Sequence, residues 1–198
     1  MTTVLDYGLN NLSSVIKAIR FLGFEARTAT TIADDTSRLI IPGVGAFGAA
    51  MAQLRELREP IREFAASGRP VFGICLGMQL LADASDEFGT HAGLGLIPGM
   101  VRYLPREAGL KVPHIGWSAI APRPDREIVT GVRTGDFAYF VHSLHLVCDE
   151  PADVAATCEY GVTFTAAVQR GNVWGTQFHP EKSSQTGMTI LRSFLTCS

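Results

Sequence analysis

The sequence predicts a single α/β domain, in which a mixed and mostly parallel central sheet is flanked by helices. Three observations support this prediction. The 198 residues suit one domain, and 46% of them are hydrophobic, which is enough for a substantial core. The first half of the chain alternates apolar strands with amphipathic helical segments, a pattern typical of a parallel sheet. The second half is rich in Val, Phe, Tyr, Trp and Thr between turn residues, which indicates further strands.

Short apolar segments predict four strands in the first half: Thr2–Asp6, Phe24–Ala29, Arg38–Ile41 and Pro70–Cys75. The last of them is apolar on both faces, as a central parallel strand should be. Helical spacing of apolar residues predicts a helix after the first strand, and Gly23 is placed to end it. A longer helical stretch runs from Met51 to Phe64, where Pro60 predicts a kink or a new helix. Met78–Ala82 opens the next helix.

The second half predicts strands over four further segments: Lys111–Trp117, Phe137–Val147, Val154–Glu159 and Phe164–Phe178. The last segment has the form of a hairpin that turns at residues 170–172. An amphipathic helix is expected over Thr189–Thr196. Because no internal repeat or interdomain linker interrupts the pattern, one domain over residues 1–198 is expected.

Composition and charge exclude several classes of function. Seventeen Lys and Arg against 19 Asp and Glu give a net charge of −2, which argues against nucleic-acid binding and a polybasic membrane patch. No apolar run reaches the ~18 residues of a membrane-spanning helix, and the first residues lack the basic segment of a signal peptide. The four cysteines form no C-x-x-C pair, so we expect reduced thiols and a cytoplasmic location.

The sharpest local feature is the segment 70–79 (PVFGICLGMQ), where an apolar strand ends in Gly-x-Cys-x-Gly and turns directly into a helix. This pattern predicts a nucleophile elbow, with Cys75 in place of the serine of G-x-S-x-G hydrolases. Glycines flank the turn because larger side chains would clash there. The N-terminus of the following helix favours the thiolate form of the cysteine. The alternative is a buried structural cysteine between two packing glycines.

A thiolate nucleophile needs a base and an orienting acid, and His179 is the best placed of the five histidines. It follows a predicted strand, and Pro180 favours an extended conformation at the residue before it. Residues i and i+2 of an extended segment point to the same side, so Glu181 can reach the second imidazole nitrogen, as in a catalytic triad. The alternative is that this His-Pro-Glu segment is only the end of a loop.

The remaining histidines give no sign of a metal site. His142 and His145 are three residues apart in an expected strand, so they should point to opposite faces. No cluster of cysteines or aspartates accompanies them, so no metal is expected. We interpret His91 and His114 as ordinary polar or core histidines.

The segment 43–48 (GVGAFG) matches G-x-G-x-x-G, but its context differs from that of a dinucleotide fingerprint. It follows the third strand rather than the first, and the next strand ends in Cys75 rather than an acidic residue. A tight loop beside the nucleophile is the better interpretation. Its backbone N–H groups would form one half of an oxyanion hole, and the N–H of Leu76 would form the other half.

Together, the elbow at 73–79 and the distant His-Pro-Glu segment resemble the class I, triad-type glutamine amidotransferases. The resemblance implies a flavodoxin-like fold and hydrolysis of L-glutamine to glutamate and ammonia through a cysteine thioester, without cofactor or metal. It implies that the catalytic residues are Cys75, His179 and Glu181. It also implies a set of oxyanion and glutamine-binding residues: Gly43, Val44, Leu76, Gln79, Ser143 and Leu144.

Within this family, the chain is most similar to the glutaminase subunits of imidazole glycerol phosphate synthases, which act in histidine biosynthesis. The similarity rests on short segments along the whole chain, including residues 6–8, 42–45, 93–99, 111–117, 139–143 and 178–183. It implies a heterodimer with a (β/α)₈-barrel cyclase, which uses the ammonia to form imidazole glycerol phosphate and AICAR. The implied interface residues are Asn10, Asn11, Trp117 and Lys182. The chain departs from the usual pattern at Asn10, Ser118 and Leu144.

Three alternatives remain open. The chain could be the glutaminase subunit of another synthase, for anthranilate, aminodeoxychorismate or pyridoxal phosphate, although residues 6–8 and 111–117 argue against these. A cysteine peptidase of similar α/β fold also uses an elbow cysteine and a histidine, but Glu181 and the 42–45 loop favour the amidotransferase. A non-enzymatic regulatory module is the third alternative, and it would not need an intact set of Cys, His and Glu.

Overall fold

The computed structural model describes residues 1–8, 12–105 and 110–197. Within these residues a nine-stranded mixed sheet has the order β2-β1-β3-β4-β13-β12-β11-β8-β9. The half from β2 to β13 is parallel, and the half from β13 to β9 is antiparallel. The strands of this sheet are β1 (Thr2–Leu5), β2 (Ala26–Ala29), β3 (Arg38–Gly43), β4 (Val71–Cys75), β8 (His114–Pro122), β9 (Phe137–His142), β11 (Val154–Tyr160), β12 (Val162–Arg170) and β13 (Val173–Thr176).

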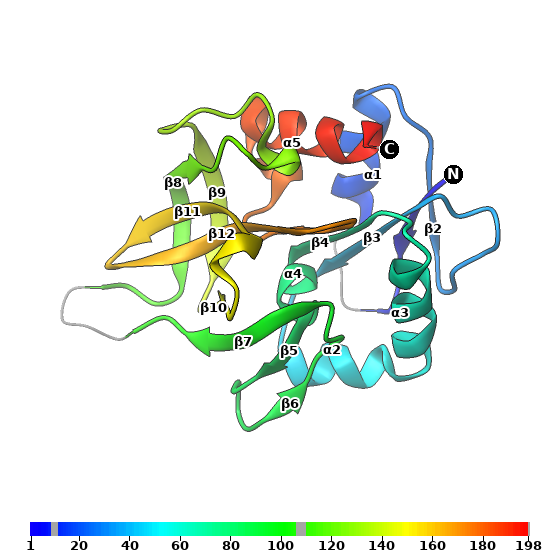
Figure 1. Cartoon of the computed structure of the whole chain (residues 1–198), viewed down its shortest axis with the longest axis horizontal. Helices are drawn as coiled ribbons and strands as arrows, with labels where there is room; N and C mark the ends of the chain where they lie inside the picture. Colours follow the sequence, from blue (N-terminus) through cyan, green and yellow to red (C-terminus); the bar gives the residue numbers. More distant parts are fainter. Residues whose placement is uncertain (9–11, 106–109, 198) are drawn as a thin grey trace.

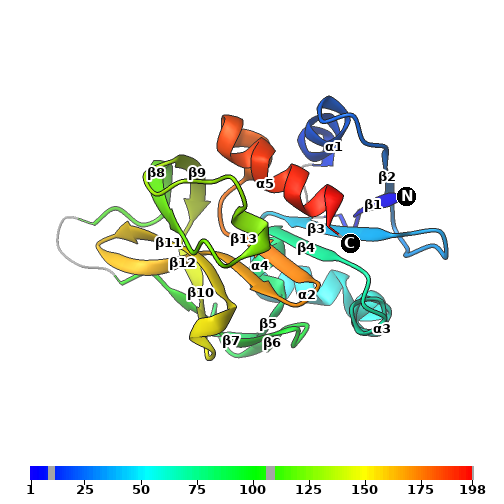
Figure 2. The ribbon, with the colours of Figure 1, turned by 45° about the horizontal axis from the view of Figure 1, so that its top comes forward.

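Helices cover both faces of the parallel half, as Figures 1 and 2 show. On one face lie α1 (Leu12–Phe21) and α5 (Ser184–Thr196), and on the other lie α2 (Phe47–Gln53), α3 (Arg58–Ala66) and α4 (Leu76–Leu80). Alternate residues of β4 serve the two faces: Phe72 packs with the α1 and α5 side chains, and Val71 packs with those of α2 and α3. All five residues of β4 are buried, which confirms the expected central strand.

A second sheet of four strands, in the order β10-β7-β5-β6, lies on the α2 and α4 side of the large sheet (Figure 2). Its strands are β5 (Ala82–Ser85), β6 (His91–Ala92), β7 (Ile97–Tyr103) and β10 (Leu144–Cys148). Strand β5 replaces the longer helix that the sequence predicted from Met78 onward. The segment 82–85 (ADAS) contains no β-branched or aromatic residue, so local propensity gives no strand signal there.

The expected strand Phe137–Val147 is divided at Ser143, where the chain leaves the large sheet and joins the small one. The carbonyl of Ser143 accepts a hydrogen bond from the N–H of Leu104 at 2.9 Å, which fixes this crossing point. The alternation of apolar residues continues through β9 and β10, so it does not reveal the change of sheet. As a result Ser143 and Leu144 lie where the two sheets diverge.

Several other boundaries agree with the sequence or shift by a few residues. The hairpin at 170–172 is confirmed by the antiparallel pairing of Arg170 with Val173. The helical stretch from Met51 breaks at residues 54–57, and Pro60 lies in the first turn of α3, where a missing N–H removes no helical bond. Short 3₁₀ turns complete the fold: η1 (Arg55–Leu57), η2 (Glu127–Val129), η3 (Pro151–Asp153) and η4 (Pro180–Lys182). No helix in the described ranges has the length and apolar character needed to cross a bilayer.

Candidate active site

The elbow predicted from the sequence is present at the junction of β4 and α4. Cys75 is the last residue of β4 and has φ 55° and ψ −111°, a strained conformation for a residue with a side chain. A Cβ at Gly77 would overlap the Ile41 carbonyl oxygen, and a Cβ at Gly73 would lie 2.6 Å from the Gly77 carbonyl oxygen. Only glycine fits at either position, and the turn therefore projects the thiol from the carboxyl end of the parallel strands.

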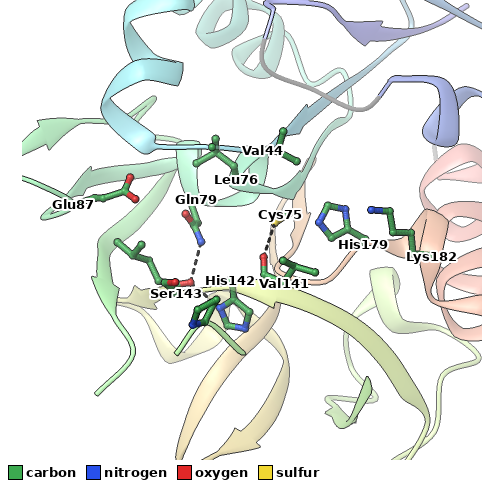
Figure 3. A pocket seen from close by; sticks show the side chains of 13 residues that line it. Val44, Cys75, Leu76, Gln79, Glu87, Val141, His142, Ser143, His179 and Lys182 are labelled. Atoms are coloured by element: carbon green, nitrogen blue, oxygen red, sulfur yellow. Dashed lines mark hydrogen bonds between the residues drawn. The ribbon is translucent and has the colours of Figure 1, made fainter. Parts of the chain in front are cut away.

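The His-Pro-Glu segment follows β13, the parallel neighbour of β4. His179 is extended, with φ −88° and ψ 101°, and its N–H donates to the Tyr139 carbonyl at 3.0 Å. Its Nδ1 lies 2.9 Å from Oε1 of Glu181, and both side chains are almost fully buried. The imidazole lies beside the Cys75 sulfur in Figure 3, so the three side chains form one contiguous group.

The protonation of His179 is set by its partners. Burial disfavours the imidazolium, but hydrogen bonds and charges from Cys75 and Glu181 outweigh burial and raise the pKa of His179 to about 9. Because Nδ1 is engaged by the carboxylate, Nε2 is the nitrogen available to exchange a proton beside the sulfur. The imidazolium form of His179 is therefore favoured beside the Cys75 sulfur at neutral pH.

A cavity of about 320 Å³ opens beside these residues (Figure 3). Eight residues singled out from the sequence line it: Val44, Cys75, Leu76, Gln79, Ser143, Leu144, His179 and Lys182. Gly43 lies just behind the cavity, paired with Cys75 across β3 and β4. Trp117 is half exposed on β8 and is not part of the lining. Asn10 and Asn11 lie outside the described residues.

Two lining or supporting side chains were not found from the sequence. Nε2 of Gln177 lies 3.9 Å from the Cys75 sulfur, and its Oε1 accepts a hydrogen bond from Nε2 of Gln79 at 3.0 Å. Its position two residues before His179 is the same i, i+2 relation that suggested Glu181, so this signal was available. Glu87 lines the far end of the cavity, where its carboxylate accepts a hydrogen bond from the N–H of Phe47. No local motif marks Glu87.

Tyr7 contacts the loop that begins at Pro42 and Gly43. Its hydroxyl donates to the Pro42 carbonyl at 2.6 Å, and a Cβ at Gly43 would meet that hydroxyl at 2.5 Å. Burial, together with the nearby charge of Cys75, raises the pKa of Tyr7, so the phenol remains a hydrogen-bond donor. The loop continues through Gly45, whose φ of 108° lies in the region that favours glycine.

The remaining histidines also have defined places. His142 ends β9 and His145 lies in β10, so the break at Ser143 separates them onto different strands. His114 is buried, as expected of a core histidine, and its Nδ1 lies 3.0 Å from Nε2 of His142. Among the described residues, no group of three potential metal-ligating His, Cys, Asp or Glu side chains is present.

The fold and the elbow place the protein among α/β proteins with a thiol at the nucleophile turn, and the comparisons with known proteins are consistent with this. The family model described as "Glutamine amidotransferase class-I" matches residues 3–197. The chain belongs to the class-I glutamine amidotransferase family.

Individual relatives show which members of this family the chain resembles. The chain is 47% identical over 203 residues to the imidazole glycerol phosphate synthase subunit HisH of Syntrophotalea carbinolica, covering 98% of each chain. It is 45% identical over 201 residues to the imidazole glycerol phosphate synthase hisHF, chloroplastic, of Arabidopsis thaliana, covering 98% of this chain and 34% of that protein. The structure of PurLQS from Thermotoga maritima has a TM-score of 0.77 at 22% identity, covering 98% of this chain and 96% of that chain, and shows the shared fold.

Proposed function

We propose that the chain is the glutaminase subunit of an imidazole glycerol phosphate synthase and forms a single glutamine amidotransferase domain over residues 1–198. It hydrolyses L-glutamine and passes the ammonia to a cyclase subunit in histidine biosynthesis. The observation that carries this proposal is the contiguous group of Cys75, His179 and Glu181 at one cavity. The proposal is also supported by the similarity of the chain to a HisH subunit, with 47% identity over nearly the full length.

In the first half of the reaction, the Cys75 thiolate attacks the side-chain amide carbon of glutamine. A carbon–sulfur bond forms, and the carbonyl π electrons move onto the oxygen. We assign the binding of this oxyanion to backbone N–H groups at Gly43–Val44 and at Leu76, the first residue of α4. The protonated His179 then gives its proton to the amide nitrogen, the carbon–nitrogen bond breaks, and ammonia leaves a glutamyl thioester.

In the second half, water hydrolyses the thioester. The now neutral His179 accepts a proton from the water, whose oxygen attacks the thioester carbon. The carbon–sulfur bond breaks, which releases glutamate and restores the Cys75 thiolate. Glu181 accepts the Nδ1–H hydrogen bond throughout, so it orients the ring and stabilises the imidazolium that forms in this step.

Substrate binding is assigned to the end of the cavity away from His179. Both hydrogens of the Gln79 amide nitrogen are used, by the Leu144 carbonyl at 2.9 Å and by Gln177 at 3.0 Å. Its amide oxygen is therefore left as an acceptor for a donor in the cavity, and the Glu87 carboxylate lies at the same end (Figure 3). The Gln79 amide oxygen and the Glu87 carboxylate together can accept hydrogen bonds from the α-ammonium group of an amino acid. Ser143 also lines the cavity, and we assign it to glutamine binding.

The partner surface is assigned to the hairpin of β8 and β9. Large apolar side chains are exposed there: Ile115, Trp117, Phe137 and Val141. An exposed group of this kind on a well-packed domain favours a protein interface. It adjoins the cavity, because Val141 lines the cavity and Lys182, directly after Glu181, lies at the same mouth. In the Arabidopsis relative the matched region is only 34% of the protein, which leaves room for a linked partner. We place the complex in the cytoplasm.

The proposed function is tested by glutamate release from glutamine, measured for the chain alone, with the barrel cyclase, and with the cyclase plus its nucleotide substrate. We expect very slow release by the chain alone and a rise at each addition, because hydrolysis without an acceptor would waste ammonia. A rate that is equal in all three cases would contradict the coupling. Peptide cleavage without glutamine hydrolysis would instead identify a peptidase, and activation by a different synthase would identify another amidotransferase subunit.

The interface is tested with a Trp117→Ala, Lys182→Ala double variant. We expect the ratio of glutamate release with the cyclase to release by the chain alone to be lower in the double variant than in the unmodified chain. Full activation of the double variant would contradict this surface as the route of coupling.

A further inference from the structure

A chain of buried and partly buried hydrogen bonds runs from strand β8 to the end of the cavity near Gln79. The hydroxyl of Ser118 lies 2.9 Å from Nε2 of His114, and Nδ1 of His114 lies 3.0 Å from Nε2 of His142. Nδ1 of His142 in turn lies 2.8 Å from the carbonyl oxygen of Leu144. We call these four residues the histidine relay. The proposed mechanism uses neither of its histidines.

The direction of every bond in the histidine relay is fixed by its last member. A carbonyl oxygen only accepts, so Nδ1 of His142 must carry the hydrogen, and in the neutral ring Nε2 is then an acceptor. His114 must therefore donate from Nδ1, which leaves its own Nε2 to accept from the Ser118 hydroxyl. All three donors point the same way, toward Leu144.

The surroundings hold the histidine relay neutral and rigid. The ring of His114 is stacked between Tyr160, with ring centroids 3.9 Å apart, and Phe140, at 5.0 Å. Burial lowers the pKa of His114, and it lowers that of His142 to about 3. Neither ring carries a charge at neutral pH, so the directional pattern is maintained there.

The Leu144 carbonyl is the point where the histidine relay meets the cavity. It accepts from His142 on one side and from Nε2 of Gln79 at 2.9 Å on the other. This contact requires the nitrogen of the Gln79 amide, not its oxygen, to face Leu144. Oε1 of Gln177 accepts from the same nitrogen at 3.0 Å, so a displaced Leu144 carbonyl would leave the Gln79 amide held in this orientation by one acceptor instead of two.

We propose that His142, oriented by His114 and Ser118, is a positioning residue that holds the Leu144 carbonyl so that Gln79 presents its amide oxygen to the α-ammonium group of the substrate. This inference rests on the proposed function, because it concerns how the substrate L-glutamine is recognised.

The test uses two variants of His142 in the complex with the cyclase. His142→Asn keeps a nitrogen donor at the position of Nδ1, whereas His142→Gln places its amide near the position of Nε2 and leaves Leu144 without that donor. Hydrolysis is measured with glutamine and with glutaramate, the analogue that lacks the α-amino group. The readout is the ratio of kcat/KM for glutamine to kcat/KM for glutaramate.

We expect His142→Gln to lower this ratio about threefold to tenfold, mainly through a higher KM for glutamine, the size of one net hydrogen bond. His142→Asn should keep the ratio within about twofold. The matched control is Tyr160→Phe, which keeps the ring stacked on His114 but removes the hydroxyl bond to the Lys111 carbonyl, and its ratio should not change. An unchanged ratio in His142→Gln, or an equal fall in both His142 variants, would overturn the proposal.

If His142→Gln does not fold, the same ratio is measured for Ser118→Ala instead. Removing the hydroxyl takes away the donor to Nε2 of His114, so the His114 ring is held less firmly and positions Nε2 of His142 less precisely. The ratio should fall at least about twofold, and an unchanged ratio would overturn the inference while leaving the proposed function intact. Absence of glutamine hydrolysis by the unmodified complex would overturn both.

Discussion

His179 and His142 are buried to almost the same degree, with 5% and 6% of their surfaces exposed, but their pKa values move in opposite directions. The pKa of His179 is raised to about 9 and that of His142 is lowered to about 3. Burial acts on both rings in the same sense. The difference comes from their partners: a carboxylate and a thiol beside His179, and a neutral imidazole and a carbonyl beside His142.

The comparison shows how one domain holds a charged and a neutral histidine in the lining of the same cavity. The raised pKa of His179 contributes stability that is fully present below the unfolded value of about 6.5 and is lost as the pH rises through about 9. The lowered pKa of His142 acts in the opposite window, because stability falls as the pH drops below about 6.5 toward 3. The first ring suits proton transfer, and the second suits fixed orientation.

Removing the charged ring should have the largest effect. His179→Ala eliminates the proton donor for ammonia and the acceptor for water, so we expect glutaminase kcat to fall by ~10²–10⁴-fold. His142→Asn should change kcat only slightly. Steady-state glutamate release in the presence of the cyclase measures both, with circular dichroism as the control for folding. Comparable losses in the two variants would remove the distinction between the two histidines.

Glu181→Gln should have a smaller effect on the rate. The amide can still accept a hydrogen bond from Nδ1, but it provides no negative charge, so the pKa of His179 should fall from about 9. We expect kcat to drop less than in His179→Ala. A loss equal to that of His179→Ala would show that Glu181 does more than orient and charge the ring.

The pH profile of the unmodified protein is the next test. Ammonia can leave only while His179 carries its proton, so kcat/KM for glutamine should decrease above about pH 9, approaching tenfold per pH unit. In Glu181→Gln this alkaline decrease should begin at a lower pH. The profile is measured in the complex over a range in which both proteins stay folded. An alkaline limb at the same pH in both proteins would contradict the assignment of the charge to this pair.

The smallest expected effect concerns stability in acid. Below about pH 6.5 the unfolded chain binds a proton at His142 that the folded chain does not, so stability should decline by up to about 1.4 kcal/mol per pH unit for this group. His142→Asn lacks the titrating ring, so its unfolding free energy should depend less on pH between 6.5 and 4. Urea unfolding at a series of pH values gives both slopes. Equal slopes would indicate that His142 is protonated in the folded state.

The sequence was informative where the signal is local. The elbow around Cys75 needs two glycines at fixed offsets, and the relation of His179 to Glu181 needs only extended backbone and Pro180, so both geometries follow from short segments. The alternation of strands and helices similarly predicted the parallel half of the large sheet. Each of these features depends on residues within about ten positions of one another.

Features that depend on distant segments could not be predicted in this way. The small sheet forms because β7 pairs with β5 on one side and with β10 on the other, and residues 82–85 carry no strand propensity of their own. The histidine relay joins β8 to β9 through the pairing of His114 with His142, a register that no local pattern specifies. Glu87 reaches the cavity only because the small sheet carries it there.

The central claim, that Cys75 is the nucleophile of a glutaminase, is tested most directly by covalent labelling with an electrophilic glutamine analogue such as 6-diazo-5-oxo-L-norleucine. The other three cysteines offer an internal control: burial raises the pKa of Cys148 to about 12 and that of Cys158 to about 11, and it also raises that of Cys197. Peptide mass spectrometry of the labelled complex should find one adduct, on Cys75, and excess glutamine should slow its formation. An adduct on Cys148, Cys158 or Cys197 instead, or labelling that glutamine does not slow, would contradict the account.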